Sequence, residues 1–421
     1  MKIKLSVPYG KEEITFELSK ENILDYAASV KQEIYPTPEA IVKEALENPI
    51  GQKHLHHLAA GCKTVAIIIS DYTRPTPTAF LLPYVLEELF QGGISLENIT
   101  IVSASGLHAP NSEADLERAL GQYYGKISVI CHDASDNMHL TYLGESTRGT
   151  PIYINSSVVN ADLKISIGGI EPHHSAGWSG GAKNVLPGVA GRKTILFHHA
   201  RAHEPGVELG RIKGNPFRED LDEVGVIVGL DFILNVILND KKQIIAAFTG
   251  DLIKAHQTGV ETVRKMLTTK TGEHPDIVIV TPGGSPRDLN FWQCEGKALT
   301  RIRHVVKHGG VVILVAQGTE GIGNKEFAEI LENNSIEEIR QRFEQEEFSV
   351  ALNKGFRLVQ LLDKASLFIV SEGLKKEMFP KLPVEVFRDI DKALNKALNI
   401  TGKSSKVLVV PKAPAVIIEI D

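Results

Sequence analysis

The feature of this sequence that most constrains its fold is a regular alternation of short runs rich in valine and isoleucine with longer segments of helical periodicity. The runs at residues 64–70 (TVAIIIS) and 98–103 (NITIVS) are each followed by an amphipathic segment, at about residues 79–90 and from about residue 112. Short apolar runs between helices are typical of buried strands in βα units. The pattern therefore predicts an α/β fold with a mainly parallel sheet flanked by helices.

The alternation occurs twice along the 421 residues, which predicts two domains. The first series also includes the predicted strands at residues 127–131 and 163–167. The second series consists of predicted strands at residues 276–281, 310–315 and 366–370, with a helix that runs through Arg303.

A helix predicted over residues 252–267 precedes a polar stretch at residues 268–275 (TTKTGEHP), which we interpret as the domain linker. We therefore predict domains of residues 1–270 and 271–421, with the active site in the cleft between them. The last segment, residues 406–420, holds two short strands that either close the edge of the second sheet or return to the first domain.

Composition excludes several classes of function. The chain has 46 Lys and Arg against 52 Asp and Glu and no dense basic stretch, so a nucleic-acid partner is not expected. Its three cysteines lie far apart in no CxxC spacing, which argues against disulfides and thiolate metal sites and favours a reducing compartment. The first residues lack the apolar stretch of a signal peptide, and we find no apolar run of membrane-spanning length. We expect a cytoplasmic protein without a membrane partner.

Two loops that follow predicted strands carry candidate site residues, because ligands of open α/β sheets bind beyond the carboxyl ends of the strands. Asp71, Thr73 and Arg74 (in DYTRPTP) could hold an anionic group at the start of the next helix, or simply cap that helix beside a surface arginine. In the second loop (SASGLHAP), Gly106 permits a sharp turn before His108. That histidine is either a base at neutral pH or a structural residue.

The densest candidate is the glycine-rich segment 168–191, GGIEPHHSAGWSGGAKNVLPGVAG. Its glycines allow close approach of a ligand to the backbone, and exposed N–H groups suit a phosphate. It matches neither the Walker A loop nor the GxGxxG fingerprint. A flexible glycine loop with solvated histidine and lysine side chains is the alternative interpretation.

Two further segments carry candidate ligands. In FHHARAH, His199 and His203 would share one face of a helix, as two metal ligands do, although the acid-containing HExxH pattern is missing and a partly buried or capping histidine is an equal alternative. In the second domain, the loop after the strand at residues 276–281 places Arg287, Gln293 and Lys297 where a substrate between the domains could meet them.

Taken together, DYTRP, SASGLH, EPHHSAGWSGGAKNVLPG and FHH, in this order, resemble the nickel-dependent lactate racemase family, the racemases and epimerases of 2-hydroxy acids. The resemblance covers nearly the whole chain. It implies a nickel-pincer nucleotide, pyridinium-3-thioamide-5-thiocarboxylic acid mononucleotide, supplied by separate biosynthetic enzymes, which holds nickel through one carbon and two sulfurs. Lys183 matches the lysine that joins this cofactor through a thioamide, and His199 matches the histidine that completes the nickel coordination.

The resemblance also implies roles for other residues. His108 and His173 match two general bases, one for each bound orientation of the substrate, while the C2 hydrogen leaves as hydride and returns to the other face of a planar 2-keto acid. The residues that would hold the cofactor are Asp71, Thr73, Arg74, Gly177, Ser179, Gly180 and Gly181. Those that would bind the substrate are Arg74, Gln293 and Lys297.

One departure bears on the substrate. Lactate-specific members carry a tryptophan late in the second domain, where this chain reads VALNKGF at residues 350–356. Lactate is the first expectation and another short or aryl 2-hydroxy acid is the second. From other classes, a zinc metallohydrolase would use His173, His174, His199 and His203, and a non-catalytic nucleotide-binding protein would use the glycine-rich segment.

Overall fold

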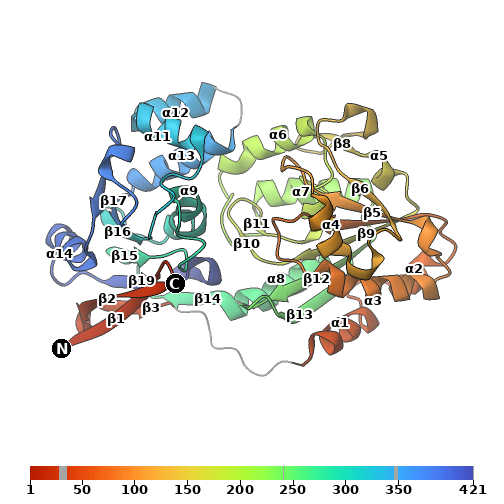
Figure 1. Ribbon diagram of the computed structural model, residues 1–421, viewed down its shortest axis with the longest axis horizontal. Helices are drawn as coiled ribbons and strands as arrows, with labels where there is room; N and C mark the ends of the chain where they lie inside the picture. The colour runs from red at the N-terminus through yellow and green to blue at the C-terminus, as the bar shows by residue number, and fades with distance from the viewer. Residues whose placement is uncertain (28–35, 240, 346–348, 421) are drawn as a thin grey trace. The chain divides into compact units, whose positions relative to one another are not determined.

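The computed structural model describes residues 1–27, 36–239, 241–345 and 349–420, and the chain divides into two compact units (Figure 1). Unit 1 comprises Met1–Lys31 and Met266–Asp421, and unit 2 comprises Gln32–Lys265. Both are α/β units with a six-stranded sheet, which confirms the predicted fold class.

The sheet of unit 2 has the strand order β13-β12-β9-β4-β5-β6, and every neighbouring pair is parallel except β12 with β13. The four strands predicted here are confirmed as β4, β5, β6 and β9, whereas the antiparallel edge was not predicted. The strands are β4 (Val65–Ser70), β5 (Ile99–Ala104), β6 (Ser128–Cys131), β9 (Leu163–Gly169), β12 (Phe232–Leu238) and β13 (Ile244–Gly250).

Helices cover both faces of this sheet, as the buried pattern of β4 requires. Ile67 and Ile69 pack into one apolar core with α1 (Pro38–Glu47), α2 (Leu55–Ala59) and α3 (Thr78–Gln91). Ile68 points to the opposite core, which includes α6 (Arg192–Ala200), α7 (Pro216–Val228) and α8 (Lys254–Leu267). The remaining regular elements of unit 2 are α4 (Glu113–Leu120), α5 (Ser156–Val159), the hairpin of β7 (Leu140–Glu145) and β8 (Pro151–Asn155), and the short β10 (Pro172–His173) and β11 (Gly177–Trp178).

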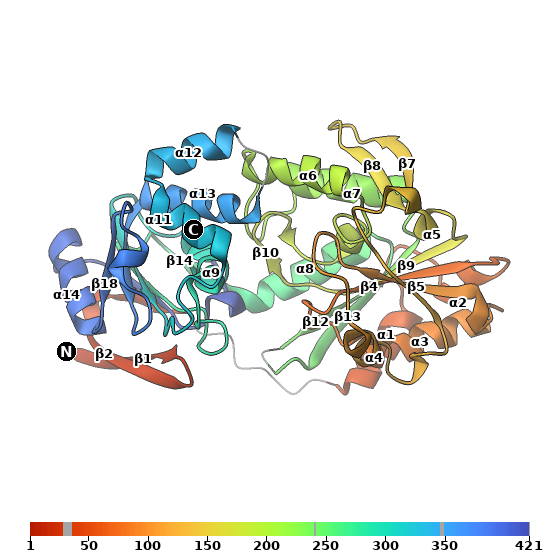
Figure 2. The ribbon, with the colours of Figure 1, turned by 45° about the horizontal axis from the view of Figure 1, so that its top comes forward.

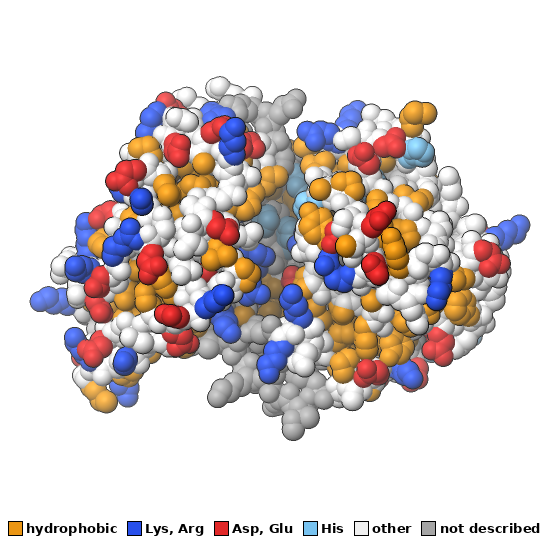
Figure 3. All heavy atoms as spheres, viewed as in Figure 1, with side chains coloured by type: hydrophobic (Ala, Val, Ile, Leu, Met, Phe, Trp, Pro, Cys, Tyr) orange, Lys and Arg blue, Asp and Glu red, His pale blue; other side chains and the backbone are white. Residues whose placement is uncertain are grey.

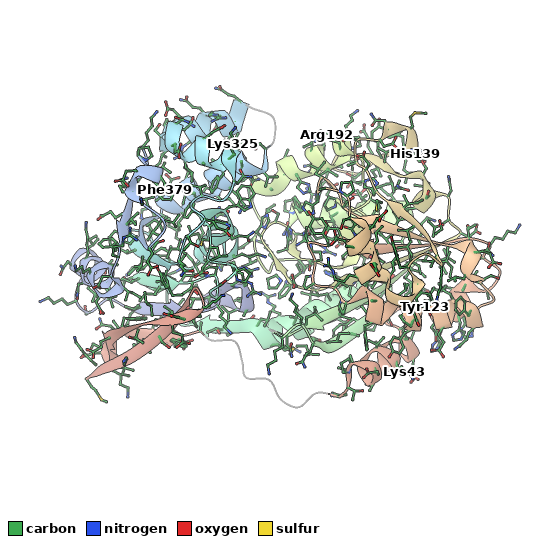
Figure 4. The ribbon with its side chains drawn as sticks, in the orientation of Figure 1. Lys43, Tyr123, His139, Arg192, Lys325 and Phe379 are labelled. Carbon is green, nitrogen blue, oxygen red and sulfur yellow. The ribbon has the colours of Figure 1, made fainter. Side chains whose placement is uncertain are left out.

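The sheet of unit 1 is parallel throughout, in the order β18-β17-β16-β15-β19-β3. Its strands are β3 (Ile23–Tyr26), β15 (Ile277–Val280), β16 (Gly310–Val315), β17 (Ala365–Val370), β18 (Val384–Phe387) and β19 (Val407–Val410). The helices on one face are α9 (Phe291–Cys294), α10 (Thr300–Ile302), α11 (Lys325–Asn333), α12 (Ile336–Gln345) and α13 (Val350–Leu362). On that face Phe379, labelled in Figure 4, is fully buried with its ring 4.9 Å from that of Phe291.

The start of the chain belongs to unit 1, which differs from the prediction that residues 1–270 form one domain. Strand β3 pairs with β19 at the edge of the sheet. The hairpin of β1 (Lys2–Tyr9) and β2 (Glu12–Ser19) lies beside α14 (Ile390–Thr401) over the second face of the sheet (Figures 1 and 2). That face therefore obtains its apolar cover from the N-terminal segment, a pairing between distant parts of the chain that local sequence patterns do not reveal.

The segment interpreted as a linker is partly regular structure. Thr268–Thr271 forms β14, which pairs in parallel with β20 (Ile417–Ile420). Both ends of the C-terminal half therefore stay in unit 1, and β19 lies inside its sheet rather than returning to the other unit.

On the face of the described residues shown in Figure 3, cationic and anionic side chains are intermingled over both units. In the described part of the chain, no helix has the length and apolarity needed to cross a membrane.

Candidate functional site

A cavity in unit 2 opens at the point where the strand order of the sheet reverses. The chain continues from β4 to β5 and β6 on one side, whereas β9 and β12 lie on the other. Such a reversal leaves a crevice at the carboxyl ends of the strands. The predicted site residues that line the cavity are Asp71, Arg74, His108, Ser179, Gly180 and Lys183. Three loops that sequence patterns singled out therefore meet in one place.

Asp71 and His108 form a hydrogen-bonded pair at the cavity. Asp71 is buried and directly follows β4, and its Oδ2 lies 2.6 Å from Nδ1 of His108. Thr73 donates to the other carboxylate oxygen from Oγ1 at 2.6 Å. Burial raises the pKa of Asp71, but the hydrogen bonds from His108 and Thr73 outweigh it, so the pKa is lowered overall. Because an ionised carboxylate only accepts, Nδ1 of His108 carries a proton, and in the neutral ring Nε2 keeps a lone pair.

The turn that presents His108 depends on Gly106. This residue has a φ of 55°, in the left-handed region, and its N–H donates to the carbonyl of Gly188 at 2.9 Å. A Cβ there would lie 3.3 Å from the carbonyl oxygen of Pro187. His108 N then closes the turn on the carbonyl of Ser105 at 2.9 Å. The predicted role of Gly106 in the sharp turn is therefore confirmed.

His173 has the opposite hydrogen-bond polarity to His108. It ends β10, and its Nδ1 accepts N–H groups from Ser175 at 3.2 Å and Ala176 at 3.1 Å. An acceptor at Nδ1 places the proton of the neutral ring on Nε2. Burial, followed by the charges of Lys183 and His174, lowers the pKa of His173 well below its usual range. The side chain is thus held neutral as an Nε2–H donor.

Lys183 lies in a short 3-10 turn, Gly181–Asn184, that follows the glycine-rich loop. Burial, together with the charges of Arg74 and Arg218, lowers the pKa of Lys183 to about 7. A lysine in such surroundings is partly unprotonated at neutral pH and is then a nucleophile. The next residue, Asn184, fixes this turn to β9, because its Nδ2 donates to Ser166 Oγ at 3.0 Å and to the carbonyl of Ile167 at 2.9 Å.

His199 lies in the last turn of α6, the helix that begins at Arg192 (Figure 4). Burial lowers the pKa of His199 well below its usual range, and the charges of His198, Lys183 and His108 lower it further. The helix expected to carry both His199 and His203 ends at Ala200, and His203 belongs to the 3-10 turn that follows it, Arg201–His203.

The glycine-rich loop packs against protein more than the sequence suggested. Gly177 and Gly181 both have positive φ, and a Cβ would lie 2.0 Å from the carbonyl oxygen of Arg211 and 2.4 Å from Nη2 of Arg218, respectively. The N–H of Gly181 donates to Asn235 at 2.8 Å, so it is not available to a phosphate. Among the described lining residues, Gly180 belongs to the cavity, whereas Thr73, His173, Gly177, Gly181 and His199 do not.

The predicted substrate-binding residues Gln293 and Lys297 lie in unit 1, on consecutive helical turns. Asn290 caps α9 by accepting the N–H of Gln293 at 3.0 Å. Lys297 lies in a π-helical segment, Glu295–Leu299, a geometry that is frequent at functional sites. Their role toward a substrate, and that of Arg287, stay predictions, as does an active site between the domains.

Glu295 was not predicted and anchors that π-helical segment. It is 1% exposed, and its carboxylate lies 2.8 Å from Nζ of Lys354 and 3.1 Å from Nη2 of Arg357. These cations lower the pKa of Glu295 to about 2 against the opposing effect of burial. A signal was present in the sequence, since Lys354 and Arg357 lie three residues apart within a helical segment that is rich in apolar residues.

Burial of neutral histidines predicts an acid-sensitive unit 2. The histidines whose pKa burial lowers are His132, His173, His198, His199 and His256. In the unfolded chain each of these histidines has the ordinary pKa of about 6.5, so below that pH it binds a proton on unfolding. The free energy of unfolding therefore has its full value above about pH 6.5. Below that pH it falls by at most about 1.4 kcal/mol per pH unit for each histidine. Denaturant titrations of the protein between neutral pH and about pH 5 measure this slope.

His132 supplies the matched variant for that measurement. Its Nε2 lies 2.9 Å from the carbonyl oxygen of Ala190, and it lines no part of the cavity among the described residues. His132→Gln removes one titrating group, and we expect a shallower slope in the same range. A wild-type stability that does not change over this range would contradict the account of neutral buried histidines.

The zinc metallohydrolase alternative requires a cluster of protein ligands. Within the described residues, no group of three or more His, Cys, Asp or Glu side chains is arranged to hold a metal ion. The four histidines that this alternative invoked therefore do not supply a ligand set by themselves.

Comparisons with known proteins match both halves of the chain. Residues 9–210 match the family model described as lactate racemase N-terminal domain, and residues 270–418 match the lactate racemase C-terminal domain. The lactate racemase of Thermoanaerobacterium thermosaccharolyticum is 31% identical, covering 98% of this chain and 99% of the relative. That of Lactiplantibacillus plantarum is 30% identical, covering 99% of this chain and 100% of the relative.

Solved structures agree. The lactate racemase apoprotein from T. thermosaccharolyticum superposes with a TM-score of 0.89 at 30% identity, covering 99% of this chain and 100% of that one. A protein from Thermotoga maritima superposes with a TM-score of 0.66 at 17% identity, covering 92% of this chain and 100% of that one, which shows a common fold.

Proposed function

Because this chain belongs to the lactate racemase family, we propose that it interconverts the two enantiomers of lactate, using a nickel-pincer nucleotide attached to Lys183. The observation that carries this proposal is the meeting of the Asp71–His108 pair and Lys183 in one cavity. We further propose that the protein works in the cytoplasm and receives its cofactor from separate biosynthetic enzymes. Another 2-hydroxy acid is the second candidate, because residues 350–356 lack tryptophan.

The residues present fit the proposed cofactor. Lys183 lines the cavity with a pKa lowered to about 7, which favours the unprotonated amine that an attachment through nitrogen needs. Arg74 adds a cation to the same cavity, as an anionic phosphate requires. Burial, with the charges of His198 and Lys183, holds His199 neutral, the state in which imidazole binds a metal ion. When bound, the cofactor supplies an acceptor for the hydride from C2 of the substrate.

His108 is prepared to remove the proton of the substrate hydroxyl. Its Nε2 lone pair is available, and Asp71 holds the ring by Nδ1 and stabilises the imidazolium that forms. Loss of hydride from C2 alone would leave positive charge on the substrate oxygen, which is costly in a partly dry cavity. Removal of the hydroxyl proton at the same time avoids that charge. The side chain of His108 is 49% exposed, so its proton exchanges with solvent between turnovers.

His173 presents Nε2–H and can donate a hydrogen bond to the substrate oxygen. A neutral ring that gave up this proton would become an imidazolate, so we propose that His173 first takes up a second proton and then returns one to oxygen on the other face of the keto acid. To serve as the base for the opposite enantiomer, it must move its remaining proton to Nδ1. That tautomer loses the N–H bonds from Ser175 and Ala176. We propose that this loop adjusts when substrate binds in the second orientation. Arg74, Gln293 and Lys297 are the proposed partners of the substrate carboxylate and its polar groups.

Substitution of the two histidines tests these roles. We expect His108→Ala and His173→Ala each to abolish racemisation while nickel stays bound. We expect Asp71→Asn to lower kcat by about 10²–10⁴-fold, because His108 loses the carboxylate that orients its ring. Turnover by chiral chromatography and nickel content by elemental analysis measure the two effects. Retained turnover in either alanine variant would remove that histidine from the mechanism.

A further inference from the structure

Beneath the glycine-rich loop lies a buried cation that the proposed chemistry does not use. Arg218, in the first turn of α7, is fully buried. Its Nε donates to Asp222 Oδ2 at 2.9 Å, and Nη2 lies 2.6 Å from the other carboxylate oxygen. Nη1 donates to the carbonyl oxygens of Trp178 at 3.3 Å and Gly180 at 3.4 Å. A guanidinium thus binds two carbonyls of the loop that precedes Lys183.

His256 of α8 binds the carbonyl of Ser179, which lies between those of Trp178 and Gly180. Its Nε2 lies 2.8 Å from the carbonyl oxygen of Ser179, so Nε2 must donate. Its Nδ1 lies 3.2 Å from Nη2 of Arg218 and must accept. The tautomer is therefore fixed by both neighbours, and the ring is 1% exposed. Burial and the charge of Arg218 lower the pKa of His256 well below its usual range, which keeps this chain of bonds intact at neutral pH.

Three consecutive carbonyls, those of Trp178, Ser179 and Gly180, are thereby bound by α7 and α8. The conformation requires glycine, since a Cβ on Gly181 would lie 2.4 Å from Nη2 of Arg218 and 3.1 Å from the ring of His256. The carbonyl of Gly180 also accepts the N–H of Lys183 at 3.3 Å. Arg218 therefore contacts the same backbone atom that begins the turn carrying Lys183.

The charge of Arg218 acts on Lys183 as well. Burial has the largest effect on the pKa of Lys183, and the charges of Arg74 and Arg218 also contribute to lowering it to about 7. The other titratable side chains coupled to Lys183 are His173 of β10 and His198 and His199 of α6, all with lowered pKa values. Arg74 is exposed after β4, so Arg218 is the buried member of the two cations.

We propose that Arg218 and His256 are positioning residues that hold the Trp178–Gly180 backbone in place and set the reactivity of Lys183. This proposal rests on the proposed function of Lys183 as the attachment residue. Neither side chain lines the cavity among the described residues, so they act through the loop and through charge rather than by touching the substrate.

Acetylation of apo-protein by acetic anhydride, followed by peptide mass spectrometry over a range of pH, tests the charge effect without the cofactor. Wild-type Lys183 is expected to have its labelling midpoint near pH 7. Arg218→Met removes the cation, and we expect the midpoint to rise by about one pH unit. Leu221→Ala is the control for loss of packing without loss of charge, because Leu221 is buried on α7 in the apolar core that also includes Ala182 and Val185. Its midpoint is expected to stay at the wild-type value.

His256→Phe separates positioning from charge, since it removes the bond to Ser179 and leaves the guanidinium. We expect faster hydrogen exchange in the peptide spanning residues 177–184 and a smaller fraction of cofactor-loaded protein. A labelling midpoint for Arg218→Met equal to that of wild type, or equal changes in Leu221→Ala, would overturn the proposal. Wild-type protein that never carries the adduct would contradict the proposed function instead, while these apo-protein measurements would still decide the roles of Arg218 and His256.

Discussion

Replacing Lys183 by alanine is expected to remove both the cofactor adduct and the racemase activity, whereas the alanine variants of His108 and His173 keep the nickel. The amine of Lys183 lies in the cavity with a pKa lowered to about 7, and no neighbouring lysine lines that cavity among the described residues. Loss of a covalent attachment point leaves no group to hold the reacting centre, and we expect a fall in rate of at least about 10³-fold. Intact-mass analysis of protein made in cells that produce the cofactor measures the adduct, and peptide mapping locates it.

Lys183→Arg is the matched control, because it keeps a cation in the cavity but cannot become a neutral nucleophile at ordinary pH. It is expected to behave like Lys183→Ala in both measurements. Fully active wild-type protein with an unmodified Lys183 would contradict the assignment of this residue.

Replacing Glu295 by alanine is expected to destabilise unit 1 by about 3–5 kcal/mol, the largest structural effect we predict. The substitution leaves Lys354 and Arg357, which are 8% and 9% exposed, without their carboxylate. An unpaired buried charge costs far more than an exposed ion pair contributes. Denaturant unfolding, followed by a probe specific to unit 1 such as hydrogen exchange of β16 and β17, measures the change.

Glu337→Ala gives the comparison on an exposed site of the same unit. The side chain of Glu337 is 68% exposed, and its carboxylate lies 3.5 Å from Nε of Arg340. We expect a loss below about 1 kcal/mol. Equal losses in the two variants would show that the Glu295 cluster is solvated, contrary to its burial.

Much of the fold could be predicted from the sequence, because buried parallel strands leave an unmistakable local signal. The isoleucine run that became β4 is apolar at successive positions, as a strand covered on both faces must be. The place of β3 could not be predicted, since its pairing with β19 joins residues nearly four hundred positions apart and depends on which edge of the sheet is open. The predicted boundary near residue 270 lies close to Met266, where unit 1 resumes, but local patterns do not predict that the start of the chain belongs to unit 1.

The candidate site shows the same division between local and long-range information. His108 and Lys183 were found because each follows a strand or a glycine-rich turn that has its own sequence signal. The hydrogen bond between Asp71 and His108 was not predicted, because it depends on β4 and β5 being neighbours in the sheet. For Arg218 and His256 the difficulty was greater. The two residues lie on different helices, and in the sequence each resembles an ordinary surface residue. Only the packing of α7 and α8 brings them to the glycine-rich loop.

The measurement that tests the central claim most directly is chiral analysis of single-enantiomer lactate incubated with protein that carries the adduct on Lys183. Racemisation predicts that D-lactate and L-lactate, in separate reactions, both approach the same equal mixture of enantiomers. A panel of other 2-hydroxy acids run in parallel decides between lactate and the second candidate substrate class. Fully loaded protein that leaves both lactate enantiomers and every member of the panel unchanged would contradict the account.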